Sequence, residues 1–125
     1  MTSDILDNHE IDWFIRKDLN LSGKYGGIYG VVGSDIRPFN KATCEEPSIY
    51  VFLLQPDENS TGHWVCVLKR NKNFIYYDPF GSIPPRIIFE EFPNLGVSSN
   101  VYQRLSEDDC GIICLRIIEK KFSKN

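Results

Sequence analysis

Four polar side chains spread along the sequence have the types that thiol chemistry needs: His63, Asp78, Gln103 and Cys110. A cysteine acts as a nucleophile in its thiolate form, and an imidazole titrates near neutral pH, so it can accept the thiol proton. A carboxylate can fix the tautomer of that imidazole, and a glutamine amide can donate a hydrogen bond to an oxyanion. Each residue has an ordinary structural explanation when taken alone. The prediction therefore rests on the ordered set.

Cys110 is predicted to lie in the first turn of the last helix. Apolar residues recur with helical spacing over residues 111–121, and an acidic stretch, residues 106–109, precedes the cysteine. Unpaired backbone N–H groups and the helix dipole favour a thiolate at that position. Gly111 would leave room for a substrate backbone to approach the sulfur. On its own, Cys110 would be explained more simply as a small buried hydrophobe, as we expect for Cys114.

His63 and Asp78 are predicted to lie on neighbouring strands of a hairpin. Residues 63–69 and 74–77 have strand-like patterns, and the polar residues 70–73 between them form a turn. Antiparallel neighbours lie about 4.8 Å apart, and the turn brings the start of the first strand close to the end of the second. The carboxylate could then hold the imidazole, although Asp78-Pro79 alone is explained by a turn.

The remaining segments predict an α+β fold, with a small, mostly antiparallel central sheet flanked by helices. A variant capping box at Asp7 and Glu10 indicates a first helix over residues 8–19. The glycine-rich residues 20–33 predict turns around one short strand. The other expected elements are a buried strand over residues 48–54, a short helix over 86–92 and a strand over 99–105.

Length and composition limit the function classes. The 125 residues favour a single domain, residues 1–125. The net charge of -3 and the pI of about 5.3 argue against general nucleic-acid binding. We expect no membrane span and no secretory signal, because no apolar run approaches about 20 residues and the first residues are polar. The four irregularly spaced cysteines are expected to be reduced thiols.

Several motifs together resemble the adenovirus maturation protease and the related proteases of ubiquitin-like proteins, which share the order His, acid, Gln, Cys. The motifs are Gly62-His63-Trp64, Tyr77-Asp78-Pro79-Phe80-Gly81, Gln103 and Asp109-Cys110-Gly111. Residues 11–38 also look like the N-terminal helix and glycine-rich strand of viral and transposon members. The likeness covers most of the chain and is strongest between residues 62 and 115. The spacing from Gln103 to Cys110 is closer to the adenovirus type.

The resemblance implies a cysteine endopeptidase with the nucleophile at the start of a core helix. It makes His63 the base, Asp78 its partner, Gln103 an oxyanion donor and Cys110 the nucleophile. Trp64 would form a wall of the substrate cleft beside His63, with a core aromatic as the equal alternative, and Gly111 would contact substrate.

The resemblance also suggests a substrate and a location. The substrate would be a viral capsid or other precursor protein, cut near small residues such as glycine. The location would be the virion, or the cytoplasm or virus factory of the host cell. We expect a monomer that needs no cofactor or metal. No cysteine lies between Cys66 and Cys110 and the charge is acidic, so the disulfide-linked peptide and the DNA that activate the adenovirus enzyme are not carried over.

Three alternatives stay open at this point. The same residues could serve an isopeptidase that removes ubiquitin-like modifiers, or the fold could be a catalytically silent binding module. A zinc site could use His63, Cys66, Asp78 and Cys110, whose types are suitable ligands. However, Cys66 follows His63 by three residues in a strand, so the two side chains should point to opposite faces.

Overall fold

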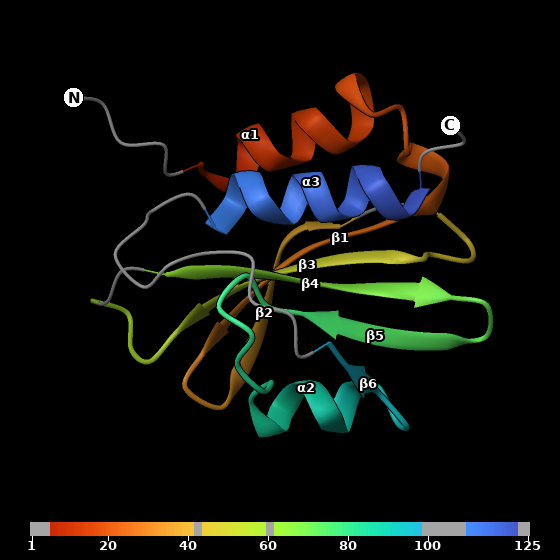
Figure 1. The fold of residues 1–125 in the computed structure, drawn as a ribbon. Coiled ribbons are helices and arrows are strands. Elements are labelled where there is room, and N and C mark those ends of the chain that lie inside the picture. Colours follow the sequence, from red (N-terminus) through yellow and green to blue (C-terminus); the bar gives the residue numbers. More distant parts are fainter. Residues whose placement is uncertain (1–5, 42–43, 60–61, 99–109, 123–125) are drawn as a thin grey trace.

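A six-stranded mixed sheet forms the centre of the molecule, with helices on both of its faces (Figure 1). The computed structural model describes residues 6–41, 44–59, 62–98 and 110–122. The strands of the described part are β1 (Tyr25–Val32), β2 (Asp35–Lys41), β3 (Ile49–Gln55), β4 (His63–Arg70), β5 (Asn73–Tyr77) and β6 (Gly96–Val97).

The sheet has the strand order β2-β1-β3-β4-β5-β6. The pairs β1/β2, β3/β4 and β4/β5 are antiparallel, whereas β1/β3 and β5/β6 are parallel. Antiparallel pairing therefore predominates, and the molecule is a mixed α/β structure compatible with the predicted α+β class.

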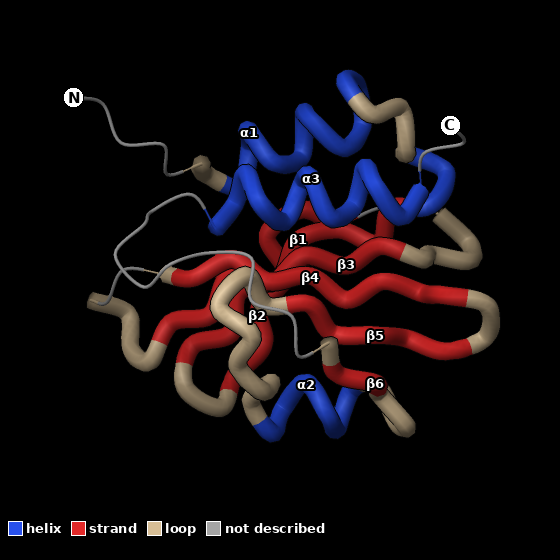
Figure 2. The backbone as a smooth tube through the Cα atoms, viewed as in Figure 1, coloured by secondary structure: helices blue, strands red, loops and turns tan. Residues whose placement is uncertain are grey.

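The helices divide between the two faces of the sheet, as the tube in Figure 2 shows. One face carries α1 (Asn8–Trp13), the π-helical turn η1 (Phe14–Asp18) and α3 (Cys110–Phe122), and the other carries α2 (Arg86–Glu91). A short 3-10 turn, η2 (Ser22–Lys24), leads into β1. No helix in the described ranges is both long and apolar enough to span a bilayer.

The start of α1 is fixed by the predicted capping box. Asp7 accepts a hydrogen bond from the backbone N–H of Glu10 at 2.8 Å, and the Glu10 carboxylate accepts one from the Asp7 N–H at 3.0 Å. These two bonds satisfy N–H groups that have no partner inside the helix. The helical segment continues to Asp18 as predicted, but its second half is π-helical. Ile11 and Ile15 point from it into the core.

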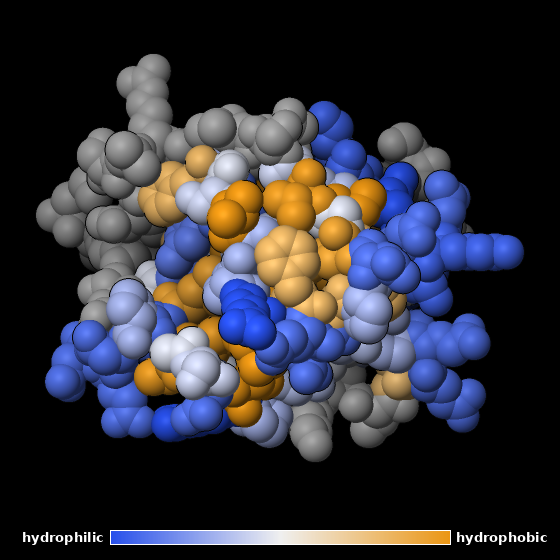
Figure 3. All heavy atoms as spheres, turned by 90° about the horizontal axis from the view of Figure 1, so that it is seen from below, coloured by the Kyte–Doolittle hydropathy of each residue, from blue (hydrophilic) through white to orange (hydrophobic). Residues whose placement is uncertain are grey.

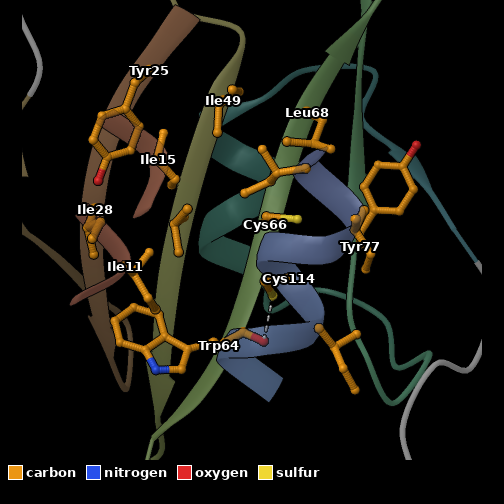
Figure 4. Close-up of a cluster of buried hydrophobic side chains, with 14 residues drawn as sticks. Ile11, Ile15, Tyr25, Ile28, Ile49, Trp64, Cys66, Leu68, Tyr77 and Cys114 are labelled. Atoms are coloured by element: carbon orange, nitrogen blue, oxygen red, sulfur yellow. Dashed lines mark hydrogen bonds between the residues drawn. The ribbon is translucent and has the colours of Figure 1, made fainter. Parts of the chain in front are cut away.

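The main core lies between the sheet and the helices α1 and α3 (Figure 4). Strand β4 shows why the sheet can bury both faces: Trp64, Cys66 and Leu68 face this core, whereas Val65 and Val67 face the other side. This alternation follows from the two-residue repeat of a strand. The buried residues of the main core are Ile11, Ile15, Tyr25, Ile28, Ile49, Val51, Trp64, Cys66, Leu68, Tyr77, Ile113, Cys114, Ile117 and Ile118.

The opposite face of the sheet is rich in aromatic side chains and only partly covered by α2. Tyr50 and Phe92 have ring centroids 5.1 Å apart, and Tyr29 and Phe52 lie 5.8 Å apart. Apolar side chains remain visible in the middle of this face, among polar ones (Figure 3). A groove of about 250 Å³ runs between β1, β2, β3 and the end of α2. The smaller second core thus forms on the α2 side.

Most of the predicted elements are present, but there are several differences, one of which is that β6 was not predicted. The buried strand, the hairpin, the short helix after Pro85 and the last helix are confirmed. β1 is longer than the short strand expected among residues 20–33, and β2 was not predicted at all. The strand predicted over residues 99–105 lies outside the described residues.

We expect Ile118→Ala to lower the free energy of unfolding by about 2–5 kcal/mol, because Ile118 is fully buried in the main core and its loss leaves a cavity. Urea denaturation measures this change. The matched control is Lys120→Ala on the exposed side of the same helix, which should stay within about 0.5 kcal/mol of the wild type. Equal losses in the two variants would show that Ile118 is not packed as described.

Candidate active site

The β4/β5 hairpin brings His63 and Asp78 together. Cys66 is paired with Tyr77, so one further step of the same register sets Asp78 across from Val65 and diagonal to His63. Diagonal neighbours on one face of a sheet are within reach of a long side chain. The Nε2 atom of His63 lies 2.6 Å from Oδ1 of Asp78. The predicted cross-strand contact is therefore present.

A tight turn holds the Asp78 carboxylate in place. β5 ends at Tyr77, and the backbone N–H of Gly81 donates to the Asp78 carbonyl at 2.7 Å. Gly81 has φ +74°, a left-handed conformation that glycine adopts without strain. The backbone N–H of Phe80 donates to Asp78 Oδ1 at 2.8 Å. The carboxylate is only 3% exposed, so these hydrogen bonds replace the water that it has lost.

Cys110 lies next to the start of β4, to which it is brought by α3. It is the first residue of α3, it is half-buried, and the backbone N–H of Trp64 donates to its sulfur at 3.4 Å. One turn later, the Cys114 thiol donates to the Trp64 carbonyl at 3.3 Å (Figure 4). Both sulfurs of the helix therefore contact one residue of β4, the residue that follows His63.

The far end of α3 is attached to the same strand. A guanidinium nitrogen of Arg70, the last residue of β4, donates to the backbone carbonyl of Lys121. Carbonyls of the last helical turn have no partner inside the helix, and a cation at that end also suits the helix dipole. Helix α3 is thus fastened to β4 near both ends, which fixes where Cys110 lies along the strand.

The pKa of His63 reflects both of its charged neighbours. Burial alone would lower this pKa, but hydrogen bonds with Asp78 and Cys110, together with their negative charges, outweigh burial and raise it from 6.5 to about 9. Cys110 therefore lies close enough to the imidazole to affect its pKa. At neutral pH the imidazole ring therefore carries a proton.

The two nitrogens of the imidazole have separate partners. Asp78 binds Nε2, which leaves Nδ1 as the nitrogen that can exchange a proton with the thiol. A histidine held in this way can take a proton from a thiol and later pass it to a leaving group. The arrangement is thus able to form a nucleophilic thiolate and to supply an acid next to it.

Trp64 and Gly111 lie in the core rather than on an open surface. Trp64 is 3% exposed, and its indole N–H donates to the Leu6 carbonyl at 2.9 Å. A Cβ added to Gly111 would come within 3.1 Å of the Trp64 ring. Glycine at this position therefore lets α3 pack closely against β4. Substrate contact by Trp64 or Gly111 stays a prediction.

Gln103 and Cys66 are the other two residues for which the sequence suggested a chemical role. Gln103 lies outside the described residues, so its role as an oxyanion donor also stays a prediction. Cys66 is fully buried in the main core, where it neighbours Cys114. Among the described residues, no group of three or more His, Cys, Asp and Glu side chains is arranged to hold a metal ion.

Phe80 is a site residue to which the sequence motif gave no role. Its ring stacks on the imidazole of His63, with ring centroids 4.6 Å apart and an angle of 17° between the planes. The contact is made by the turn that follows β5, so the strand pattern of the sequence did not predict it.

Comparison of the chain with protein-family models and with curated proteins gave no match.

We expect Cys110→Ala and Asp78→Asn each to lower the pKa of His63 from about 9, because the first removes a hydrogen-bond partner and the second removes a negative charge that raise it. Proton NMR titration of the imidazole resonances measures this pKa. The chain has only two histidines, so His9, on α1, serves as the internal reference in the same spectra. A His63 pKa unaffected by both substitutions would contradict the contacts described above.

Proposed function

We propose that this protein is a cysteine peptidase with Cys110 as nucleophile, His63 as general base and acid, and Asp78 as the residue that orients His63. One observation carries the proposal: a single imidazole bonds a buried carboxylate at 2.6 Å, and a half-buried cysteine lies close enough to it to help raise its pKa. The three residues come from different elements: His63 begins β4, Asp78 directly follows β5, and Cys110 begins α3. Perturbed titratable groups that converge in this way are typical of catalytic sites.

The proposed reaction proceeds through a thioester. The Cys110 thiolate attacks the carbonyl carbon of the scissile bond and forms a C–S bond, which places the negative charge on the carbonyl oxygen. As the C–N bond breaks, the His63 imidazolium gives its proton to the departing amine. Water then attacks the thioester, loses a proton to His63, and releases the acid and the free sulfur. The enzyme ends in its starting state.

The oxyanion formed on attack needs donors. We assign this role to the backbone N–H of Cys110 and to the side-chain amide of Gln103. The first N–H groups of a helix have no partner within it, which suits the N–H of Cys110, at the start of α3, to binding an anion. Removing one such donor typically costs about 10²–10³ in kcat. The order His63, Asp78, Gln103, Cys110 is what supports including the glutamine.

The resemblance in sequence motifs supports a finer assignment. We propose that the sheet and helices form a fold like that of the adenovirus maturation protease, and that the substrates are viral capsid or other precursor proteins cut near glycine and other small residues. The site of action would be the virion or the host-cell cytoplasm or virus factory. Capsid precursors and modifier conjugates offered side by side would separate this reading from an isopeptidase.

We expect Cys110→Ala to abolish cleavage and to leave the far-ultraviolet circular dichroism spectrum unchanged, because the sulfur is the attacking atom and the helix does not depend on it. Mass spectrometry of the products from candidate precursor proteins measures cleavage. The matched control is Cys44→Ala, which removes a half-exposed thiol outside the site and should cleave normally. Full activity of Cys110→Ala would end the proposal, and a wild type that cuts none of the precursors or conjugates would favour a silent binding module.

Asp78→Asn should slow the reaction without stopping it. We expect kcat to fall by about 10²–10⁴, because the imidazole loses the carboxylate that orients it and stabilises its charge. The high-pH limb of the pH–rate profile should also move to lower pH, since the protonated ring is lost at a lower pH once its pKa falls. Wild-type rates and an unmoved limb would remove Asp78 from the mechanism.

A further inference from the structure

A second ring lies flat against the imidazole of His63. Phe80 is half-buried, and its ring plane is inclined by only 17° to the imidazole at a centroid separation of 4.6 Å. Aromatic pairs prefer this kind of offset or tilted contact at such distances. His63 is therefore bounded on three sides: by Asp78 at Nε2, by Cys110, and by the Phe80 ring over one face.

We propose that Phe80 is a positioning residue, whose ring holds the imidazole plane of His63 in the orientation that faces both Asp78 and Cys110. This inference rests on the proposed function, because the orientation matters only if His63 moves protons between the sulfur and a substrate. It assigns to the ring a role that the hydrogen bonds of the site do not fill.

One hydrogen bond cannot fix a ring plane. The bond to Asp78 holds a single atom of the imidazole, and the outer side-chain torsion of histidine has a broad preference rather than sharp wells. Catalytic groups must be held within about 10–20° of the productive geometry. A stacked contact on one face of the ring restricts the rotation that hydrogen bonds at the ring edge leave free. The Phe80 ring supplies that contact.

The stacked ring also suits the charged form of the imidazole. An aromatic face carries partial negative charge and attracts a cation placed over it. Imidazole exchanges hydrogen bonds in its own plane, so a ring over its face obstructs neither Asp78 nor Cys110. The same orientation therefore serves His63 both when it accepts a proton and when it donates one.

The turn itself does not need the Phe80 side chain. Two backbone hydrogen bonds hold it, from Phe80 N–H to the Asp78 carboxylate and from Gly81 N–H to the Asp78 carbonyl. Substitutions of the ring keep both bonds. The effect of the side chain on His63 can thus be separated from the effect of the backbone on Asp78.

The test compares three variants in a Cys44→Ala background, which leaves Cys110 as the accessible thiol because Cys66 and Cys114 are buried. Phe80→Leu removes the flat ring, Phe80→Tyr keeps it, and Phe89→Leu makes the same change at an exposed position of α2. Thermal melting checks that each is folded, and Phe80→Met replaces Phe80→Leu if the latter does not fold.

Two readouts are measured for each variant. The first is the rate of Cys110 alkylation by iodoacetamide at pH 6, where an ordinary thiol is almost fully protonated. The second is kcat and KM on a cleaved peptide. We expect Phe80→Leu to lower both the alkylation rate and kcat by about 10- to 100-fold with little change in KM, because a small misplacement of a catalytic group has effects of this size. Phe80→Tyr and Phe89→Leu should behave like the wild type.

The two proposals fail in different ways. Fast alkylation of the wild type without cleavage of any peptide would overturn the peptidase, while the alkylation rates of the variants would still decide the role of Phe80. Wild-type alkylation and kcat in Phe80→Leu, or equal losses in Phe80→Leu and Phe80→Tyr, would overturn the positioning role. A wild type that alkylates no faster than a free thiol would overturn both.

Discussion

The buried carboxylate of Asp78 is the constraint on which the site depends. Removing a charge from water costs several kcal/mol unless hydrogen bonds or an opposite charge replace the lost solvation. Here one oxygen receives the Phe80 N–H and the His63 ring, and the ring contributes a positive charge as well. A neutral imidazole would leave the carboxylate poorly compensated. The buried carboxylate therefore favours the protonated form of His63 and helps to raise its pKa.

The rest of the sheet holds His63, Asp78 and Cys110 in place relative to one another. The hairpin fixes His63 and Asp78 relative to each other, and the attachment of α3 along β4 fixes Cys110 relative to both. Burial raises the pKa of Cys114, so its thiol stays protonated and acts as a hydrogen-bond donor to Trp64. The two cysteines of one helix thus have different roles because they differ in exposure.

Local sequence patterns were enough to predict the hairpin and the last helix, and with them the His63–Asp78 contact. They were not enough for β2, because Asp35–Lys41 is polar and contains Pro38, which a strand tolerates only at a sheet edge. Whether a strand lies at an edge depends on pairing between distant segments, as does the parallel β1/β3 contact. The burial of Trp64 also depends on contacts between distant segments, because Leu6 and α3 cover its side chain.

The β4/β5 hairpin precedes α3 along the chain, so the hairpin is synthesised before the helix that packs on it. A ribosome releases the hairpin with its imidazole and carboxylate before it releases the helix with the sulfur. Until Cys110 and Cys114 contact the backbone of Trp64, the sulfur of Cys110 is not held beside the hairpin. The three groups of the candidate site therefore come together only when α3 packs on the sheet.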